Sequence, residues 1–306
     1  MYSTPGSHTR RGAWDTPWVA PPEQLFAVTT RSRLKGPWRF PQMMYATLRV
    51  RRQLREDGQV VRFASVVAGP SEFWTITIWR TRHDMQEFMR TGAHDDIMWL
   101  FSRWLKSFWL MRWRPSPREV GQWKGLHLAQ PEPSDARPAL EGARAEALRN
   151  ALDHLPRLKA ATAADGSVGY DSTPYARRRR AEVGGAGGVV IHVRTSPWRT
   201  FEAVVTLRRL RQWAEADQDM LRGVVGIGKP GEIYLLALWA TREGADRLLD
   251  SPEFAALGRR FPKLWANEWM PENEFGHWDG VRLRQARERY GIAVPKIAMD
   301  VARPSD

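Results

Sequence analysis

Cysteine is absent from this sequence of 306 residues. Its absence excludes disulfides, thiolate zinc sites, cysteine nucleophiles, thiolate-ligated haem and haem attached through a C-x-x-C-H motif. Any metal that the protein binds must therefore be held by histidine, carboxylate or tyrosine side chains.

Long apolar runs are also lacking, because no stretch approaches the ~18 residues that a membrane-spanning helix needs. The N-terminal segment MYSTPGSHTRRG has no apolar core of the kind found in secretory signals. We therefore expect a cytoplasmic protein with no membrane partner. The length and the 42% hydrophobic content are sufficient for two ordinary domains, each with its own core.

Several catalytic signatures are missing as well. The sequence has no Ser-His-Asp ordering, no H-E-x-x-H, no G-x-G-x-x-G and no P-loop. The glycine-rich segment 184–188 precedes a predicted strand, which is the wrong side for a dinucleotide-binding turn. These absences weaken hydrolase and nicotinamide-dependent functions.

Acidic residues are outnumbered by basic ones, which gives a net charge of +13 and a pI near 10.6. The only dense basic run is Arg177 to Arg180, and the other arginines are spread over predicted helix faces and loops. Three interpretations stay open: a solvated basic surface, partners for anionic ligands or cofactor carboxylates, and a nucleic-acid surface.

The chain repeats itself once. Pro37-Trp38-Arg39 recurs as Pro197-Trp198-Arg199 at an offset of 160 residues. The same offset pairs further residues: Arg62 with Arg222, Glu72 with Glu232, and Trp79 with Trp239. After a loss of four residues, Trp109 and Trp113 match Trp265 and Trp269, and Trp123-Lys124-Gly125 matches Trp278-Asp279-Gly280. Two long copies indicate duplicated domains and not a solenoid of many short repeats.

Each copy has the pattern strand, helix, strand, strand, helix, strand. In the first copy the strands are predicted at 26–32, 60–67, 73–79 and 109–114, with a first helix after residue 40 and a broken second helix over 81–107. This βαββαβ order is that of a ferredoxin-like module, in which both helices cover one face of the sheet. The bare faces of two modules must be covered, so we expect them to close a barrel within one chain.

The predicted fold class is therefore α+β, with tandem ferredoxin-like modules that form an intrachain dimeric α/β barrel. The predicted boundaries are 24–125 for the first module and 126–187 for a linker with a helix. The second module is predicted at 188–280, and a C-terminal helix and tail at 281–306.

His94 is the main candidate for chemistry, because the second copy has Phe254 at the same place. Thr91 is predicted to cap the helix that carries His94, and at helical spacing His94 shares a face with Met98 and Phe101. A helix N-terminus and apolar neighbours favour the neutral imidazole, which a haem ligand or a general base requires. We therefore expect the active cavity in the first copy. The alternative is a histidine held by a local hydrogen bond or turned to solvent.

His192 is the second candidate. In the strand Val189-Val190-Ile191-His192-Val193 it shares a face with Val190, and the 160-residue offset pairs it with Ser32. Two polar residues at one position indicate a face that lines a wet cavity or an edge.

The segment Phe73 to Arg80, with the sequence FWTITIWR, followed by Thr91-Gly92-Ala93-His94, resembles the dimeric α/β-barrel superfamily. Within it, the resemblance is greatest to antibiotic-biosynthesis-type and spheroidene monooxygenase-like proteins. Several branches bind haem through a histidine on this helix, and others oxidise quinol-type substrates with no cofactor. The resemblance thus implies His94 as the axial ligand of a haem b.

The functional hypothesis is a haem-dependent, monooxygenase-like oxidoreductase that acts on a small apolar or aromatic metabolite in a biosynthetic pathway. Met98 and Phe101 would line the haem pocket, and Arg62 and Arg80 would bind the propionates. The alternatives are a cofactor-free monooxygenase, a haem-dependent dehydratase or lyase, a non-catalytic ligand-binding protein and, less expected, an RNA-binding protein. A monomer or a homodimer is expected.

Overall fold

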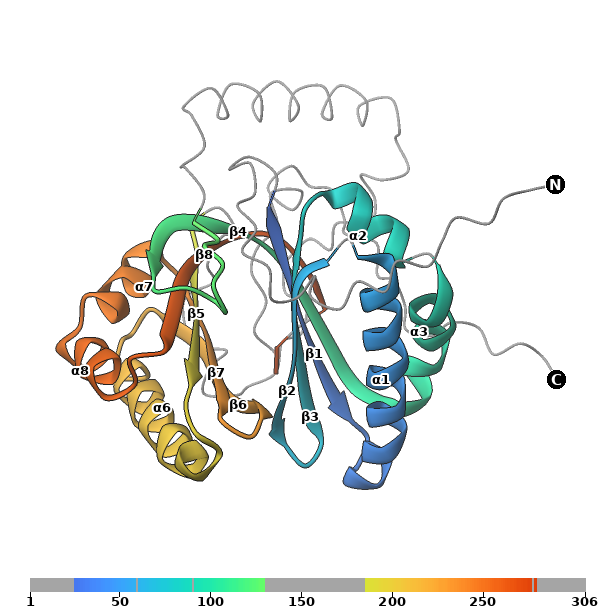
Figure 1. Ribbon diagram of the computed structural model, residues 1–306, viewed down its shortest axis with the longest axis horizontal. Coiled ribbons are helices and arrows are strands. Elements are labelled where there is room, and N and C mark those ends of the chain that lie inside the picture. Colours follow the sequence, from blue (N-terminus) through green and yellow to red (C-terminus); the bar gives the residue numbers. More distant parts are fainter. Residues whose placement is uncertain (1–24, 59, 90, 130–184, 277, 280–306) are drawn as a thin grey trace, which may run out of the picture.

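The structure is a computed structural model that describes residues 25–58, 60–89, 91–129, 185–276 and 278–279 (Figure 1). The predicted linker helix and the predicted C-terminal helix both lie outside the described residues. None of the helices in the described ranges combines the length and the apolar character that crossing a membrane requires.

The first half of the chain has the predicted order of elements, and its second helix is broken in two as expected. The elements are β1 (Phe26–Leu34), the 3-10 turn η1 (Pro37–Arg39), α1 (Phe40–Asp57), β2 (Val60–Gly69), β3 (Glu72–Trp79), α2 (Arg82–Met89), α3 (Gly92–Trp104) and β4 (Leu105–Val120). Helix α1 ends where Gly58 takes a left-handed conformation with φ 63°, which glycine adopts without strain. Strand β4 is longer at both ends than the predicted 109–114.

The second half repeats this order. Its elements are β5 (Gly187–Arg194), η2 (Pro197–Arg199), α6 (Thr200–Ala214), β6 (Met220–Lys229), β7 (Glu232–Trp239), α7 (Arg242–Leu249), α8 (Pro252–Arg260) and β8 (Leu264–Gly276). Strand β5 thus begins one residue earlier than the predicted module boundary. The predicted start of the linker also differs, because Leu126 and Leu128 are buried in the core.

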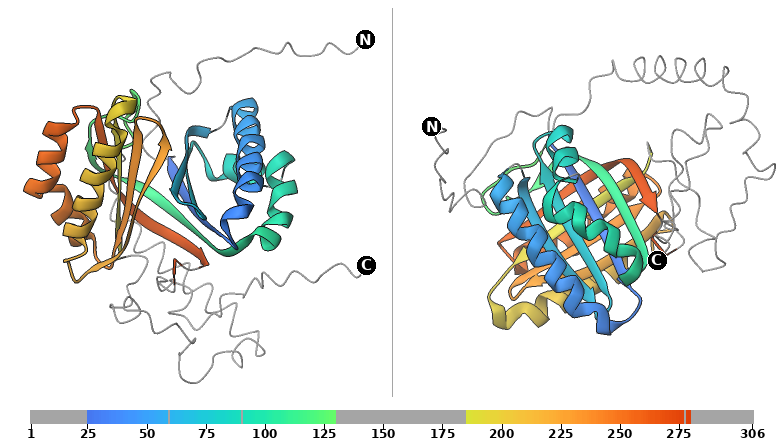
Figure 2. Two further views of the ribbon diagram at one scale, coloured as in Figure 1. Left: turned by 90° about the horizontal axis from the view of Figure 1, so that it is seen from below. Right: turned by 90° about the vertical axis from the view of Figure 1, so that its right-hand side faces the viewer.

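The eight strands form one closed antiparallel barrel in the order β1-β3-β2-β6-β7-β5-β8-β4, as expected from the bare sheet faces. The helices lie outside it, α1 to α3 against the first half and α6 to α8 against the second (Figures 1 and 2). The two seams between the halves differ. Strands β4 and β8 pair from Trp109 with Gly276 to Val120 with Ala266, whereas β2 and β6 share one pair, Val67 with Ile227.

Apolar side chains form separate cores on the two sides of the barrel wall. Outside it, the helices of each half pack on their own strands. Inside it, both halves contribute to one cluster that contains seven tryptophans: Trp74, Trp109, Trp113, Trp123, Trp265, Trp269 and Trp278. The interior is therefore a packed, aromatic core that both halves build together.

Candidate functional site

The barrel interior also contains buried charged and polar groups, and two sets of them lie beside aromatic rings. We call these groups of residues the first box and the second box. The first box consists of Arg31, Glu72, Trp74, Trp109, Trp278 and Asp279. The second box consists of Trp123, Lys124, His192, Glu232, Tyr234 and Trp265.

The second box surrounds the His192 ring with aromatic faces. The imidazole stacks on Tyr234, with 4.4 Å between ring centroids and 12° between planes, and Trp123 lies 6.0 Å from it. Trp123 in turn stacks on Trp265 at 4.8 Å. The His192 residue is only 2% exposed, and its Nε2 atom has no hydrogen-bond partner within the part of the chain that the structure describes. A buried polar atom without a partner calls for an explanation, and Trp123 Nε1 in this box and Arg31 Nη1 in the first box also lack one among the described residues.

Burial controls the ionisation of this box. It lowers the pKa of His192 to about 3, against a smaller opposing effect of the Glu232 carboxylate. Burial and the same carboxylate raise the pKa of the Tyr234 phenol well above its usual value. At neutral pH the imidazole is therefore uncharged and keeps a lone pair, while the tyrosine keeps its proton.

Glu232 lies at the edge of the second box, where β7 begins. One of its oxygens, Oε1, is 3.1 Å from Lys124 Nζ and 3.3 Å from Lys229 Nζ. Burial alone would raise the pKa of this carboxyl, but Lys124 and Lys229 outweigh that effect, so the pKa is lowered. At neutral pH the box thus has an ionised carboxylate beside a neutral imidazole.

The first box carries an ion-pair network in place of the neutral imidazole. Arg31, 1% exposed, donates from Nε to Glu72 at 2.7 Å and from Nη2 to Asp279 at 2.9 Å. Trp74 donates to the same Glu72 oxygen at 3.1 Å, and its ring lies 4.5 Å from that of Trp278. Two carboxylates thus balance the buried guanidinium, which is what charge burial requires.

The two boxes occupy equivalent places in the two halves. Strand pairing sets Arg31 opposite Trp74 and Trp109, and sets His192 opposite Tyr234 and Trp265. The equivalent of His192 is therefore Arg31, and the predicted pairing with Ser32 is wrong by one residue. The cause is one extra residue in the first half, where three residues separate Arg33 from Pro37 and only two separate Arg194 from Pro197.

Each half supplies a tryptophan to the box of the other half. Trp123 follows β4 but packs beside His192, and Trp278 follows β8 but packs beside Trp74. Arg62 of β2 holds the first of these segments through the carbonyls of Trp123 and Lys124, at 3.4 and 3.2 Å. Arg222 of β6 holds the second through the equivalent carbonyls of Trp278 and Asp279, at 3.3 and 2.6 Å.

His94 lies in the helix layer outside the barrel. Its ring packs against Phe88 of α2 with 4.8 Å between centroids, and its Nδ1 atom is 3.3 Å from the Met89 carbonyl oxygen. The predicted cap is wrong, because the Thr91 hydroxyl donates to the Glu87 carbonyl. Gln53 of α1 takes that role and accepts from the His94 backbone N–H at 2.9 Å.

The residues predicted to hold a haem do not gather around one group. His94 lies on the helix side of the sheet, whereas Arg62 points to the barrel interior and binds backbone carbonyls there. Arg80 is exposed just after β3, and the side chains of Met98 and Phe101 lie outside what the structure describes. The described members of this set therefore do not fit a single haem. In the same ranges, no three His, Asp or Glu side chains gather in a way that could hold a metal ion.

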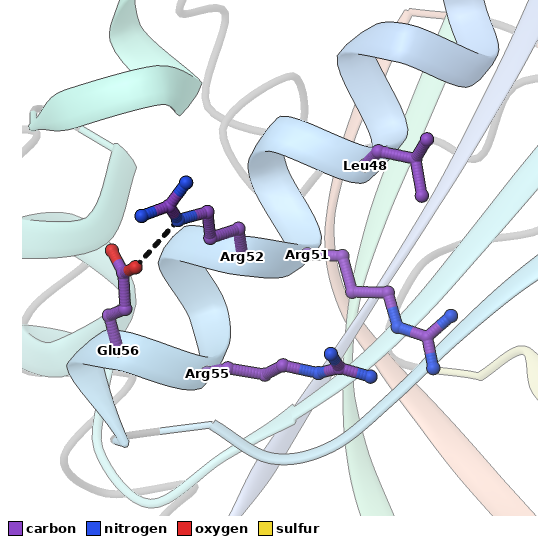
Figure 3. Close-up of a pocket in the computed structure, with 5 residues that line it drawn as sticks. All are labelled: Leu48, Arg51, Arg52, Arg55 and Glu56. Carbon is purple, nitrogen blue, oxygen red and sulfur yellow. Dashed lines mark hydrogen bonds and ion pairs between the residues drawn. The ribbon is translucent and has the colours of Figure 1, made fainter. Parts of the chain in front are cut away.

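Two surface pockets lie outside the barrel, and His94 lines neither. One, of about 350 Å³, is lined by Leu48, Arg51, Arg52, Arg55 and Glu56 of α1 (Figure 3). The other, of about 520 Å³, lies where α6, α7 and α8 meet. Figure 3 shows Arg51 and Arg55 on the side of α1 opposite to the Arg52–Glu56 ion pair.

No protein-family model and no curated protein matches the sequence. Solved structures with a similar fold include an aldoxime dehydratase, 11% identical over 84% of this chain and 85% of that one, with a TM-score of 0.47. A candidate monooxygenase from Fusobacterium nucleatum is 6% identical over 86% and 98%, with a TM-score of 0.31. Another from Lactobacillus acidophilus is 9% identical over 86% and 100%, also at 0.31. Likenesses this distant assign no reaction to the chain.

Proposed function

We propose that this chain is an oxidoreductase of the cofactor-free monooxygenase type, which oxidises a small planar aromatic metabolite with dioxygen in the second box. The observation that carries the proposal is the buried His192 imidazole, stacked on Tyr234, whose Nε2 atom makes no hydrogen bond in the described part of the chain. Aromatic faces suit a planar ring, and Nε2, in the tautomer that carries its proton on Nδ1, accepts an acidic hydrogen from that ring.

The proposed chemistry converts an activated ring CH₂ to a carbonyl. His192 Nε2 accepts one proton, and the carbanion left behind transfers its electron pair to dioxygen as a C–O bond forms. The His192 proton then completes a hydroperoxide, which loses water as the second C–H and the O–O bond break. Overall, CH₂ and O₂ give C=O and H₂O. An anion beside Nε2 stabilises the imidazolium, so the imidazole becomes more basic once the substrate ionises.

The test uses anthrone as a probe, because its ring CH₂ is acidic and its product with dioxygen is anthraquinone and water. Anthraquinone absorbance and oxygen uptake are measured for the wild type, for His192→Phe and for His94→Phe. The last variant copies Phe254, the equivalent residue in the second half. We expect His192→Phe to lose the activity and His94→Phe to keep it. Unchanged turnover in His192→Phe would refute the proposal.

A second candidate function keeps the haem prediction with His94 as its only protein ligand. It is favoured by the 3.3 Å approach of His94 Nδ1 to the Met89 carbonyl, since such a contact orients histidines that ligate metals. Haemin titration tests it separately, through the Soret band of the wild type and of His94→Phe. A Soret shift that needs His94 supports this candidate, and the same shift in both proteins contradicts it.

We also propose that the two halves arose by duplication of one ferredoxin-like module. The repeated order of elements and the equivalent registers of β1 with β3 and of β5 with β7 support this origin.

A further inference from the structure

Cations outnumber carboxylates close to His192. Those that act on the His192 imidazole include one carboxylate, Glu232, and three cations, Lys124, Arg194 and Lys229. Both lysines contact the same Glu232 oxygen, and Arg194 lies directly opposite Glu232 in the pairing of β5 with β7. Close to the imidazole one carboxylate therefore faces three cations, while a second carboxylate, Glu119, accepts from Trp265 Nε1 at 2.6 Å.

Helix α1 adds to this positive charge from the other half of the barrel. Burial and then Arg55 lower the pKa of Arg51, and the opposing effect of Glu232 shows that the Arg51 guanidinium lies within electrostatic range of this carboxylate. Arg51 and Arg55 lie together on one side of α1 (Figure 3). The equivalent place in the first box differs, because Arg31 and Arg33 are matched there by Glu72 and Asp279.

Building on the function proposed above, we propose that the substrate of the second box is an aromatic carboxylic acid. Its ring would pack on Trp123, Tyr234 and Trp265, which in this structure pack on one another and must separate to admit it. Its carboxylate would lie among Lys124, Arg194 and Lys229. Lys124 adopts a left-handed conformation with φ 52°, which turns the chain directly after Trp123. This turn allows the lysine to lie near the substrate carboxylate while Trp123 packs in the box. The first box has Asp279 at the equivalent place, with φ 47°, and would repel such a carboxylate.

The experiment measures binding, with two probes that differ only in charge, 2-naphthoate and 2-naphthamide. Titrations follow the quenching of tryptophan fluorescence in the full chain, at low and at high sodium chloride. We expect naphthoate to bind at least about fivefold more tightly than naphthamide at low salt, which is the effect of one favourable charge pair. High salt should remove most of this difference.

Lys229→Met is the informative variant, because the Lys229 side chain is 64% exposed and its loss should leave the fold intact. We expect it to weaken naphthoate binding about fivefold and to leave naphthamide binding unchanged. Arg209→Met is the matched control, because it removes the same charge from an exposed position on α6.

The outcomes separate this inference from the proposed function. Equal binding of both probes, with no effect of salt or of Lys229→Met, would refute the proposal that the substrate carries a carboxylate. An aromatic binding site in the second box would still stand. If neither probe binds, or if His192→Phe binds both as the wild type does, the proposed function fails together with this inference.

Discussion

Acid should destabilise this protein through His192, and replacement of this residue by phenylalanine should remove the effect. Burial lowers the pKa of the folded-state imidazole to about 3, whereas an imidazole in the unfolded chain titrates near 6.5. Between these values the unfolded chain binds a proton that the folded chain does not. The free energy of unfolding therefore falls as the pH falls below about 6.5, and the full contribution is present above that value.

The size of the effect follows from the linkage relation. Each pH unit in this window costs at most about 1.4 kcal/mol, so the loss between pH 6.5 and 4.5 is at most about 2.7 kcal/mol. Other groups also titrate in this range, but they are common to the wild type and to His192→Phe. The difference between the two proteins therefore isolates His192.

The assay is urea unfolding of both proteins, followed by tryptophan fluorescence at several pH values. We expect the wild type to lose up to about 2.7 kcal/mol more than His192→Phe between pH 6.5 and 4.5. Between pH 7 and 8 the imidazole is neutral in both states, so the two curves should run parallel. At pH 7 the variant should be at least as stable as the wild type, because an unpaired buried polar atom costs roughly 1–3 kcal/mol. Equal losses in acid would refute the buried, neutral imidazole.

Three further predictions concern contacts that hold the halves and the helices together. Arg31→Met leaves Glu72 and Asp279 without their buried partner and should lower the free energy of unfolding by roughly 1–3 kcal/mol, measured in urea. An unchanged urea midpoint would contradict this. Glu119→Ala removes the acceptor of Trp265 Nε1 and of the Leu128 and Ala129 amides, so amide exchange at Leu128 should accelerate, and equal exchange rates would count against it. Ser251→Ala should cost about 1 kcal/mol, because its hydroxyl accepts from Phe254 N–H as a helix cap. Thr91→Ala should cost less, since Thr91 does not cap α3, and equal losses in thermal unfolding would contradict that difference.

Much of the fold could be predicted from the sequence, because it depends on hydrophobic period and on the repeat. The broken second helix and the closed barrel follow from patterns that recur in both halves. The register of the first strand could not be found from the offset of 160 residues, because the extra residue lies in the loop before Pro37. A signal was present, since Arg33 and Arg194 match only if that extra residue is allowed for. Arg33 pairs with Glu72 at the start of β3, and Arg194 pairs with Glu232 at the start of β7.

The candidate site was predicted only in part. The sequence predicts that His192 lies on a face that lines a wet cavity or an edge, but its partners come from strands that are distant in sequence. The pairing of Arg62 with Arg222 and of Trp123 with Trp278 was visible as repetition. Each arginine holds a segment that packs into the box of the other half. This contact depends on long-range geometry, which the repeat does not reveal. A repeat in sequence identifies equivalent residues, but it does not say which half they serve.

The presence of both boxes in one chain explains how they can differ. In a barrel made of two identical chains, equivalent positions would have to carry the same residue, and either two buried arginines or two buried neutral histidines would face the interior. In this chain Arg31 is paired with Glu72 and Asp279, although its Nη1 atom has no partner among the described residues. His192 lies among aromatic rings, and its Nε2 atom has no partner in the same ranges. The first box can therefore stabilise the barrel through its ion pairs, and the second can retain an unpaired ring nitrogen that destabilises the fold by itself. Buried polar groups without a partner call for an explanation, and the function proposed for the second box would supply one for His192.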